Sequence, residues 1–112
     1  MKTLMIRYKT KKDQAAANEE LVHAVYDELR ARKPAGLRYR TFRLDDGVTF
    51  VHIATMDAPA VADKLTSLPS FKAFQKDLAA RCVEGPEPVE LHAVDFYSPD
   101  ARDPAREAGR TT

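Results

Sequence analysis

The stretch GLRYRTFRLDDGVTFVHIATM, residues 36–56, decides the fold. Apolar and polar side chains alternate along residues 37–44, and residues 48–55 are rich in β-branched and aromatic residues, and both features are typical of β-strands. The three residues between these segments, DDG, suit a three-residue hairpin loop whose glycine takes the left-handed conformation. The stretch therefore predicts two antiparallel strands joined by a tight turn.

The segments on either side of this hairpin each predict a helix and a further strand. Residues 3–9 alternate as a strand, and residues 13–32 are rich in Ala, Glu and Leu with apolar residues at helical spacing. A second helical region begins near Asp57 and breaks at SLPS, and residues 89–97 read as a fourth strand. The order β-α-β-β-α-β predicts a ferredoxin-like α+β domain, with both helices on one face of a four-stranded antiparallel sheet.

The composition fits one domain with no strong electrostatic partner. The chain has 112 residues, 44% of them hydrophobic, and a net charge of +1, so neither nucleic acid nor a membrane surface is an expected partner. The single cysteine, Cys82, cannot form an internal disulfide, and no long apolar stretch predicts a leader or a membrane span. We expect a soluble, cytoplasmic protein with one domain at residues 1–97 and a polar tail at residues 98–112.

The hairpin loop also sorts the side chains of its two strands onto faces. A three-residue loop pairs Phe42 with Phe50 and Arg40 with His52, so these four residues are predicted to share one face. The opposite face, which includes Ile53, is more continuously apolar and is assigned to the helices. A two-residue loop would instead pair Arg40 with Ile53 and would mix the two faces.

The face without helices still carries too much apolar area for contact with water, and a second copy of the chain is the simplest cover for it. His52 is a candidate general base there, because the ordinary pKa of histidine suits proton transfer near neutrality. Arg40 is a candidate catalytic residue that would hold an anionic oxygen through paired donors. The residues predicted to contact the ligand are Arg7, Phe42, Phe50 and Met56. Two alternatives stay open: His52 as a hydrogen-bonded residue of a dimer core, and the arginines in salt bridges across the interface.

Residues 36–74, GLRYRTFRLDDGVTFVHIATMDAPAVADKLTSLPSFKAF, resemble the antibiotic biosynthesis monooxygenase-like family of dimeric α+β barrel proteins. The likeness extends over residues 3–97 as an order of elements, and its most specific pieces are GLRY, the hairpin and LPSFKAF. The resemblance implies a homodimer whose two sheets form a barrel, with a pocket in each subunit. Some members of the family oxidise aromatic polyketides with oxygen and without metal or flavin, whereas others cleave haem.

The sequence departs from the haem-degrading branch at its key positions. The pocket tryptophan of that branch falls at Met56, and residues 57–82 contain no histidine that could bind haem, so no cofactor or metal is expected. The cofactor-free oxygenases also tend to use tryptophan, which this chain lacks. The leading hypothesis is a homodimeric, cofactor-independent monooxygenase acting on an aromatic or conjugated small molecule, and the expected ligand is small and either aromatic or anionic. The alternative is a non-catalytic dimer that binds a small ligand or has a structural role.

Overall fold

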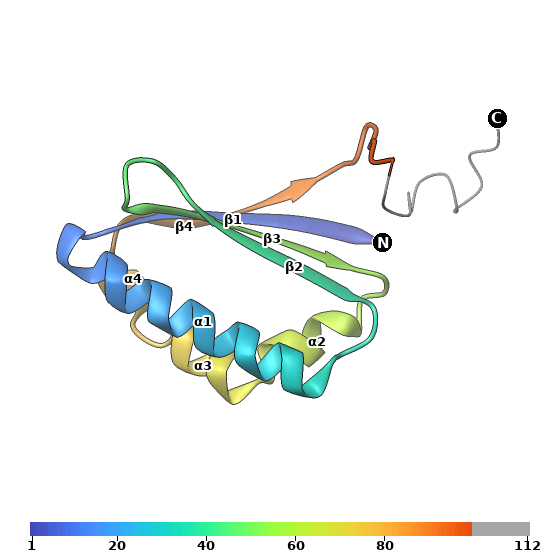
Figure 1. Ribbon diagram of the computed structural model, residues 1–112, viewed down its shortest axis with the longest axis horizontal. Coiled ribbons are helices and arrows are strands. Elements are labelled where there is room, and N and C mark those ends of the chain that lie inside the picture. The colour runs from blue at the N-terminus through green and yellow to red at the C-terminus, as the bar shows by residue number, and fades with distance from the viewer. Residues whose placement is uncertain (100–112) are drawn as a thin grey trace.

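The computed structural model describes residues 1–99 and confirms the predicted α+β architecture (Figure 1). The strands are β1 (Lys2–Thr10), β2 (Leu37–Arg43), β3 (Thr49–Met56) and β4 (Cys82–Leu91). The helices are the 3-10 turn η1 (Lys12–Gln14), α1 (Ala15–Arg32), α2 (Val61–Thr66), α3 (Pro69–Gln75) and α4 (Leu78–Arg81). The second predicted helical region is therefore three short helices, and its break at SLPS is observed, with Pro69 opening α3.

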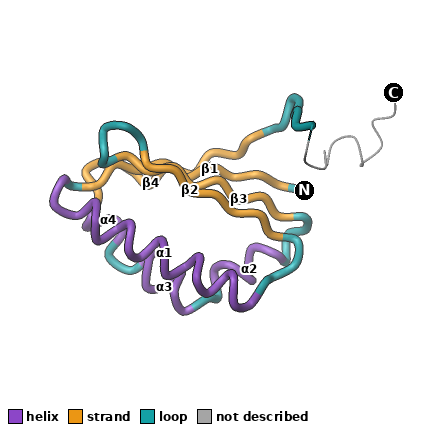
Figure 2. Tube along the Cα trace, viewed as in Figure 1, coloured by secondary structure: helices purple, strands orange, loops and turns teal. Residues whose placement is uncertain are grey.

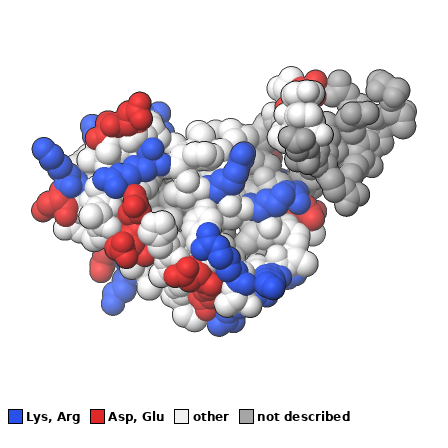
Figure 3. All heavy atoms as spheres, in the orientation of Figure 1, with Lys and Arg blue, Asp and Glu red and all other residues white. Residues whose placement is uncertain are grey.

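The four strands form one antiparallel sheet in the order β2-β3-β1-β4. Within residues 1–99, all the helices lie along one face of this sheet, and the other face has no helix over it (Figures 1 and 2). Acidic and basic side chains are interspersed on the face of the molecule seen in Figure 3, in keeping with the net charge of +1. No helix within residues 1–99 is long and apolar enough to cross a bilayer.

The core fills the layer between the sheet and the helices. Tyr8 and Phe50 are the most deeply buried aromatic residues, each 1% exposed, and their rings stack with centroids 5.5 Å apart. The helices contribute Val22 and Val25 from α1 and Phe74 from α3, all of them buried. The periodicity of the sequence predicted these helical core positions because they recur on one side of each helix.

The predicted register of the β2–β3 hairpin is wrong by one residue. Arg40 pairs with Ile53 and Thr41 with His52, which is the pairing of the alternative register. The loop itself spans residues 45–48, because the Asp46 carboxylate accepts hydrogen bonds from the backbone of Val48 and from Thr49. These bonds, led by the Thr49 hydroxyl, lower the pKa of Asp46 to about 2.

The shift of register moves every side chain of β3 to the other face, since neighbouring residues of a strand point in opposite directions. Phe50, His52 and Met56 are buried and face the helices, although they were predicted on the uncovered face. Ile53, predicted to face the helices, shares the uncovered face with Arg40 instead. The assignment of Arg40 to that face is confirmed.

The fourth strand also differs from its prediction, since β4 spans Cys82–Leu91 rather than residues 89–97. The stretch EGPEP reads as a loop, yet β4 is an edge strand, where prolines are tolerated because one side needs no N–H donors. Gly85 has a φ of +78°, and a Cβ there would lie 2.7 Å from the carbonyl oxygen of Arg7, so only glycine fits this close approach to β1.

The C-terminal end of β4 is determined by its pairing with β1. Leu91 pairs with Thr3, and β1 begins at Lys2, so β4 ends where its neighbour β1 begins. Residues 92–97, which were predicted to belong to the fourth strand, lie beyond its end. The predicted tail at residues 98–112 lies almost entirely outside the described residues and stays a prediction.

Candidate active site

The most unusual feature of the interior is a buried histidine held between two tyrosines. His52 on β3 is 3% exposed. Its Nε2 lies 2.7 Å from the hydroxyl oxygen of Tyr8 on β1. Its Nδ1 lies 2.7 Å from the hydroxyl oxygen of Tyr39 and 3.1 Å from Oγ1 of Thr41, both on β2. Both ring nitrogens are therefore engaged, and His52 links the three strands on their helix-facing side.

The polar chain continues from Tyr8 into the helices. Asn18 of α1, which is fully buried, places Nδ2 2.8 Å from the Tyr8 hydroxyl oxygen. Nε of Arg81, at the end of α4, donates to Oδ1 of Asn18 over 3.2 Å. At the opposite end, the hydroxyls of Thr41 and Tyr26 lie 2.8 Å apart. We call the connected set of Arg81, Asn18, Tyr8, His52, Tyr39, Thr41 and Tyr26 the polar chain.

Aromatic rings enclose the centre of the polar chain. The His52 ring lies 5.3 Å from the ring of Tyr8 and 5.3 Å from that of Phe74, measured between centroids. Tyr39 lies 5.8 Å from His52 on the third side and stacks on Tyr26 of α1 at 5.3 Å. Tyr39 and Tyr26 are only half-buried, so the polar chain runs from the deep interior toward the surface between α1 and the edge strand β2.

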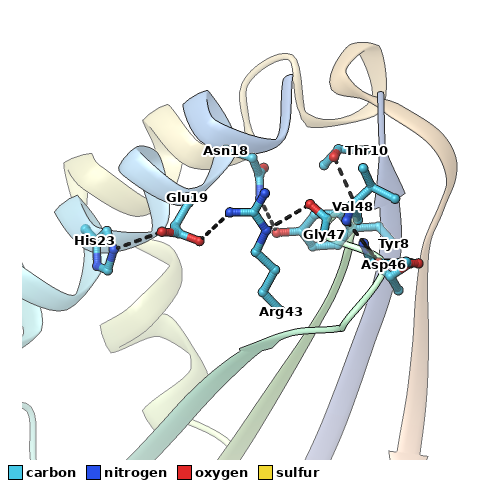
Figure 4. A network of polar contacts seen from close by, with 10 residues as sticks. Tyr8, Thr10, Asn18, Glu19, His23, Arg43, Asp46, Gly47 and Val48 are labelled. Carbon is cyan, nitrogen blue, oxygen red and sulfur yellow. Dashed lines mark hydrogen bonds and ion pairs between the residues drawn. The ribbon is translucent and has the colours of Figure 1, made fainter. Parts of the chain in front are cut away.

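The loop end of this layer is closed by an ion pair between the sheet and α1 (Figure 4). Arg43 of β2 donates from Nη1 to Glu19 over 3.0 Å and from Nε to the carbonyl oxygen of Gly47 over 2.8 Å. Glu19 also lies 3.7 Å from His23. Figure 4 shows these exposed contacts beside the buried bond from Asn18 to Tyr8, so an outer ion-pair cluster flanks the inner end of the polar chain.

Burial sets the charge state of the polar chain. It lowers the pKa of His52 to about 4 and raises the pKa values of Tyr8 and Tyr39, so at neutral pH the imidazole and both phenols are uncharged. The only charged member is Arg81, which is 7% exposed. Its guanidinium also donates to the carbonyl oxygens of Phe74 at 2.7 Å and Lys76 at 3.1 Å. Within residues 1–99 this buried cation forms no ion pair with a carboxylate.

The neutral state of His52 makes folding stability depend on pH. Because its pKa is lower in the folded chain than the ordinary 6.5, the unfolded chain binds more protons between pH 6.5 and 4. We expect this stabilisation to be complete above pH 6.5 and to be lost as the pH falls toward 4, by about 3 kcal/mol in total. A histidine-ring NMR titration checks this result. Protonation of His52 in the folded protein near pH 6.5 would contradict it.

The residues predicted to form one site are divided between the two faces of the sheet. His52, Phe50 and Met56 lie on the helix-facing side. Arg7 and Arg40 are exposed on the other side together with Phe42, over whose ring the Arg40 guanidinium lies at 5.7 Å. A single chain therefore does not bring the predicted base and the predicted anion-binding arginines together. The roles of these residues stay predictions.

Sequence reasoning missed most of the polar chain. Tyr8 and Tyr39 were correctly placed toward the helices but were read as packing residues. Asn18 is the only asparagine of the chain, and it lies on a helix between alanines and glutamates, where a buried amide needs a partner. Arg81 follows Leu78 by three residues within α4, and both side chains are buried. A polar residue at a core position was the available signal in both cases.

The uncovered face of the sheet combines apolar and charged side chains. Its central rows, read from β2 to β4, are Phe42, Val51, Arg7 and Glu87, and then Arg40, Ile53, Met5 and Val89. Phe42 is 48% exposed and Val89 is 44% exposed. A shallow hollow lined by residues 42–46 lies at the end of β2 and is open to solvent. Residues 1–99 contain no group of three or more side chains placed to bind a metal ion.

The comparison with solved structures supports the fold. A structure from Nitrosomonas europaea, provisionally described as an antibiotic biosynthesis monooxygenase, superposes with a TM-score of 0.72 and 16% identity over 84% of this chain and 99% of that one. Rv0793 from Mycobacterium tuberculosis superposes with a TM-score of 0.71 and 18% identity, over 87% of this chain and 98% of that one. A variant of SnoaB from Streptomyces nogalater, described as a cofactor-independent oxygenase, superposes with a TM-score of 0.64 and 18% identity, over 85% of this chain and 94% of that one.

These likenesses establish that the chain has the ferredoxin-like fold of the antibiotic biosynthesis monooxygenases, as its sequence predicted. No protein-family model matches the sequence, and no curated protein matches it. Identities of 16 to 18% establish the fold alone. The chemistry must therefore be argued from the side chains of this protein.

Proposed function

We propose that the protein is a homodimeric, cofactor-independent monooxygenase of an aromatic or conjugated small molecule, with its reacting centre at the Tyr39 end of the polar chain. The observation that carries the proposal is the buried, neutral His52 hydrogen-bonded to the hydroxyl oxygens of Tyr8 and Tyr39. A chain of protein donors that ends on a half-buried phenol can supply a hydrogen bond to a ligand oxygen in a site with little water. The shared fold with SnoaB supports the same reaction class.

The reaction suits a substrate with an acidic CH2 group conjugated with a carbonyl, because one hydrogen leaves in the first step and the other leaves with the water lost at the end. The Tyr39 hydroxyl, positioned by His52, donates to the carbonyl oxygen and stabilises the negative charge that forms there when the C–H proton leaves to water. The resulting carbanion gives electrons to molecular oxygen and forms a peroxide anion, which takes a proton back from water and becomes a hydroperoxide. Loss of water from the hydroperoxide leaves a new carbonyl, so one oxygen atom enters the product and the other leaves as water. In this scheme His52 assists deprotonation through Tyr39.

A second copy of the chain is proposed to cover the other face of the sheet. The apolar residues at its centre, Met5, Val51 and Ile53, are only partly buried in one chain, and exposed apolar patches of this kind mark contact surfaces. Arg7 and Arg40 would then lie between two sheets. Glu87, which pairs with Arg7 across the strands, offers a carboxylate for such arginines. In such a dimer, any ligand bound by Arg7, Arg40 and Phe42 would lie inside the barrel, between the two sheets.

Oxygen uptake with anthrone, an aromatic ketone with an acidic C–H, tests the function. We expect uptake above the uncatalysed rate and one labelled oxygen atom in the product when the gas is ¹⁸O₂. Replacing Tyr39 by phenylalanine removes the donor and should lower kcat/KM about 100-fold. Tyr97→Phe is the matched control, because Tyr97 is 85% exposed and outside the polar chain. Equal activity in both variants would refute the role of Tyr39.

One observation favours a second function, a dimer that binds a small ligand without catalysis. Both ring nitrogens of His52 are already engaged, so the imidazole offers no free lone pair to a substrate. Calorimetric titration of the purified protein with anthrone and with anthraquinone distinguishes the two functions. Binding without oxygen uptake would support the ligand-binding dimer and would exclude catalysis on this class of ketone.

A further inference from the structure

We propose that Asn18 and Arg81 are positioning residues that fix the proton of neutral His52 on Nδ1, so that the imidazole donates to Tyr39. The geometry of the polar chain assigns this tautomer by itself. Its catalytic consequence, a stronger Tyr39 donor, rests on the proposed function. Neither residue contacts the expected position of the substrate. Each therefore acts through the hydrogen bonds that connect it, by way of Tyr8 and His52, to Tyr39.

The direction of the chain begins at Arg81, because a guanidinium can only donate hydrogen bonds. The atom of Asn18 that lies 3.2 Å from Nε of Arg81 must therefore be the amide oxygen. The amide nitrogen then faces Tyr8, 2.8 Å from its hydroxyl oxygen, and donates to it. Arg81 is itself held by the carbonyl oxygens of Phe74 and Lys76, so its orientation is fixed.

The hydroxyl group of Tyr8 has a single proton to donate. Its oxygen already accepts from Asn18, and within the described residues its only other partner is Nε2 of His52 at 2.7 Å. If Nε2 carried the proton, the Tyr8 oxygen would accept twice and its own buried O–H would have no acceptor. The phenol therefore donates to Nε2, which must be the unprotonated nitrogen.

The neutrality of His52 determines which of its two ring nitrogens carries the proton. A neutral imidazole carries one proton, and with Nε2 accepting, that proton lies on Nδ1. Nδ1 then donates to the hydroxyl oxygen of Tyr39 at 2.7 Å. Every bond from Arg81 to Tyr39 thus runs in the same direction, away from the buried cation. Aligned bonds polarise one another, so the Tyr39 hydroxyl becomes a better donor to a ligand.

The test is the tautomer of His52, read from long-range ¹H–¹⁵N spectra of protein labelled at histidine. In the wild-type protein we expect Nδ1 to be the protonated nitrogen and Nε2 the unprotonated one. The exposed His23 and His92 give reference signals in the same spectra. A wild-type spectrum with the proton on Nε2 would overturn the proposal, whatever the activity of the protein.

Asn18→Asp is the decisive variant because it keeps the size of the side chain and replaces the amide donor by an acceptor. A carboxylate there can accept both from Arg81 and from the Tyr8 hydroxyl. The Tyr8 oxygen would then accept from Nε2, and the His52 proton should move from Nδ1 to Nε2. A folded Asn18→Asp protein that keeps the proton on Nδ1 would show that Asn18 does not set the tautomer. If this variant does not fold, Arg81→Met serves instead, with an equal mixture of tautomers expected and an unchanged tautomer contradicting the proposal.

Kinetics separate this inference from the proposed function. With active protein, inversion of the tautomer should lower kcat by at least about tenfold and leave KM nearly unchanged, because the effect passes through Tyr39 to the developing charge. The expected tautomers in the wild-type and Asn18→Asp proteins, together with no consumption of oxygen, would refute the proposed function and leave the positioning role of Asn18 established. An inverted tautomer with full kcat would refute the catalytic consequence.

Discussion

Replacing Phe50 by alanine should lower the free energy of unfolding by about 3 to 5 kcal/mol, the usual range for removing a buried phenylalanine. Phe50 is 1% exposed, its ring stacks on Tyr8, and the Arg43 guanidinium lies 5.7 Å from its centroid. The substitution leaves a cavity beside the polar chain, and strands β1 and β3 cannot close it without losing their pairing. Chemical denaturation followed by circular dichroism measures the change.

Phe42→Ala is the control for this experiment because the same side chain is removed from the other face of the sheet. Phe42 is 48% exposed, so its replacement should change the unfolding free energy of the single chain much less than the replacement of Phe50. The comparison also tests the register of the hairpin, which places Phe42 opposite Val51. Similar losses in the two variants under monomeric conditions would favour the register in which Phe42 and Phe50 share a face.

Introducing a lysine at Ile53 should raise the dissociation constant of the proposed dimer about a thousandfold or more, equivalent to roughly 4 kcal/mol. Ile53 lies between Arg40 and Met5 in the centre of the uncovered face. A new ammonium group there adds to the positive charge of Arg40, and in a two-fold dimer the substitution occurs twice. Burial of an unpaired charge costs several kcal/mol per ion, which is larger than the gain from one apolar contact.

Sedimentation velocity over a range of concentrations measures the association. Ala24→Lys on α1 is the charge-matched control, because Ala24 is exposed on the helical side of the molecule. The Ile53→Lys protein should stay folded and sediment as a single chain at concentrations where Ala24→Lys is dimeric. A wild-type protein that is monomeric at high concentration would exclude both the dimer and the barrel.

The order of the elements could be predicted because it depends on periodicity, which is a local property of the sequence. Alternation along residues 37–44 and helical spacing along residues 13–32 each persist over enough positions to identify an element. The ends of the helices and strands were harder to predict from the sequence. The limits of β4 depend on where β1 stops and on whether that edge of the sheet needs N–H donors, and both are properties of the folded sheet.

The candidate site was harder to predict because it depends on a single turn. Asp46 hydrogen-bonds to Val48 and Thr49, which extends the loop and moves His52 from one face to the other. A sequence pattern can favour several loop lengths, but the competition among them is decided by such side-chain bonds. The partnership of Asn18 with Arg81 joins residues that are 63 positions apart and has no local signature beyond polarity at core positions.

The two outer strands of the sheet limit how copies of the protein can assemble. Pro86 and Pro88 deprive β4 of two N–H groups that an added strand would need, and β2 carries Arg38, Arg40 and Arg43 along the other border. Ribbon-like growth by strand addition is therefore disfavoured at both borders. In the proposed dimer, by contrast, each chain covers the apolar centre of the other chain's sheet, so association would end with a closed pair and would disfavour fibre formation.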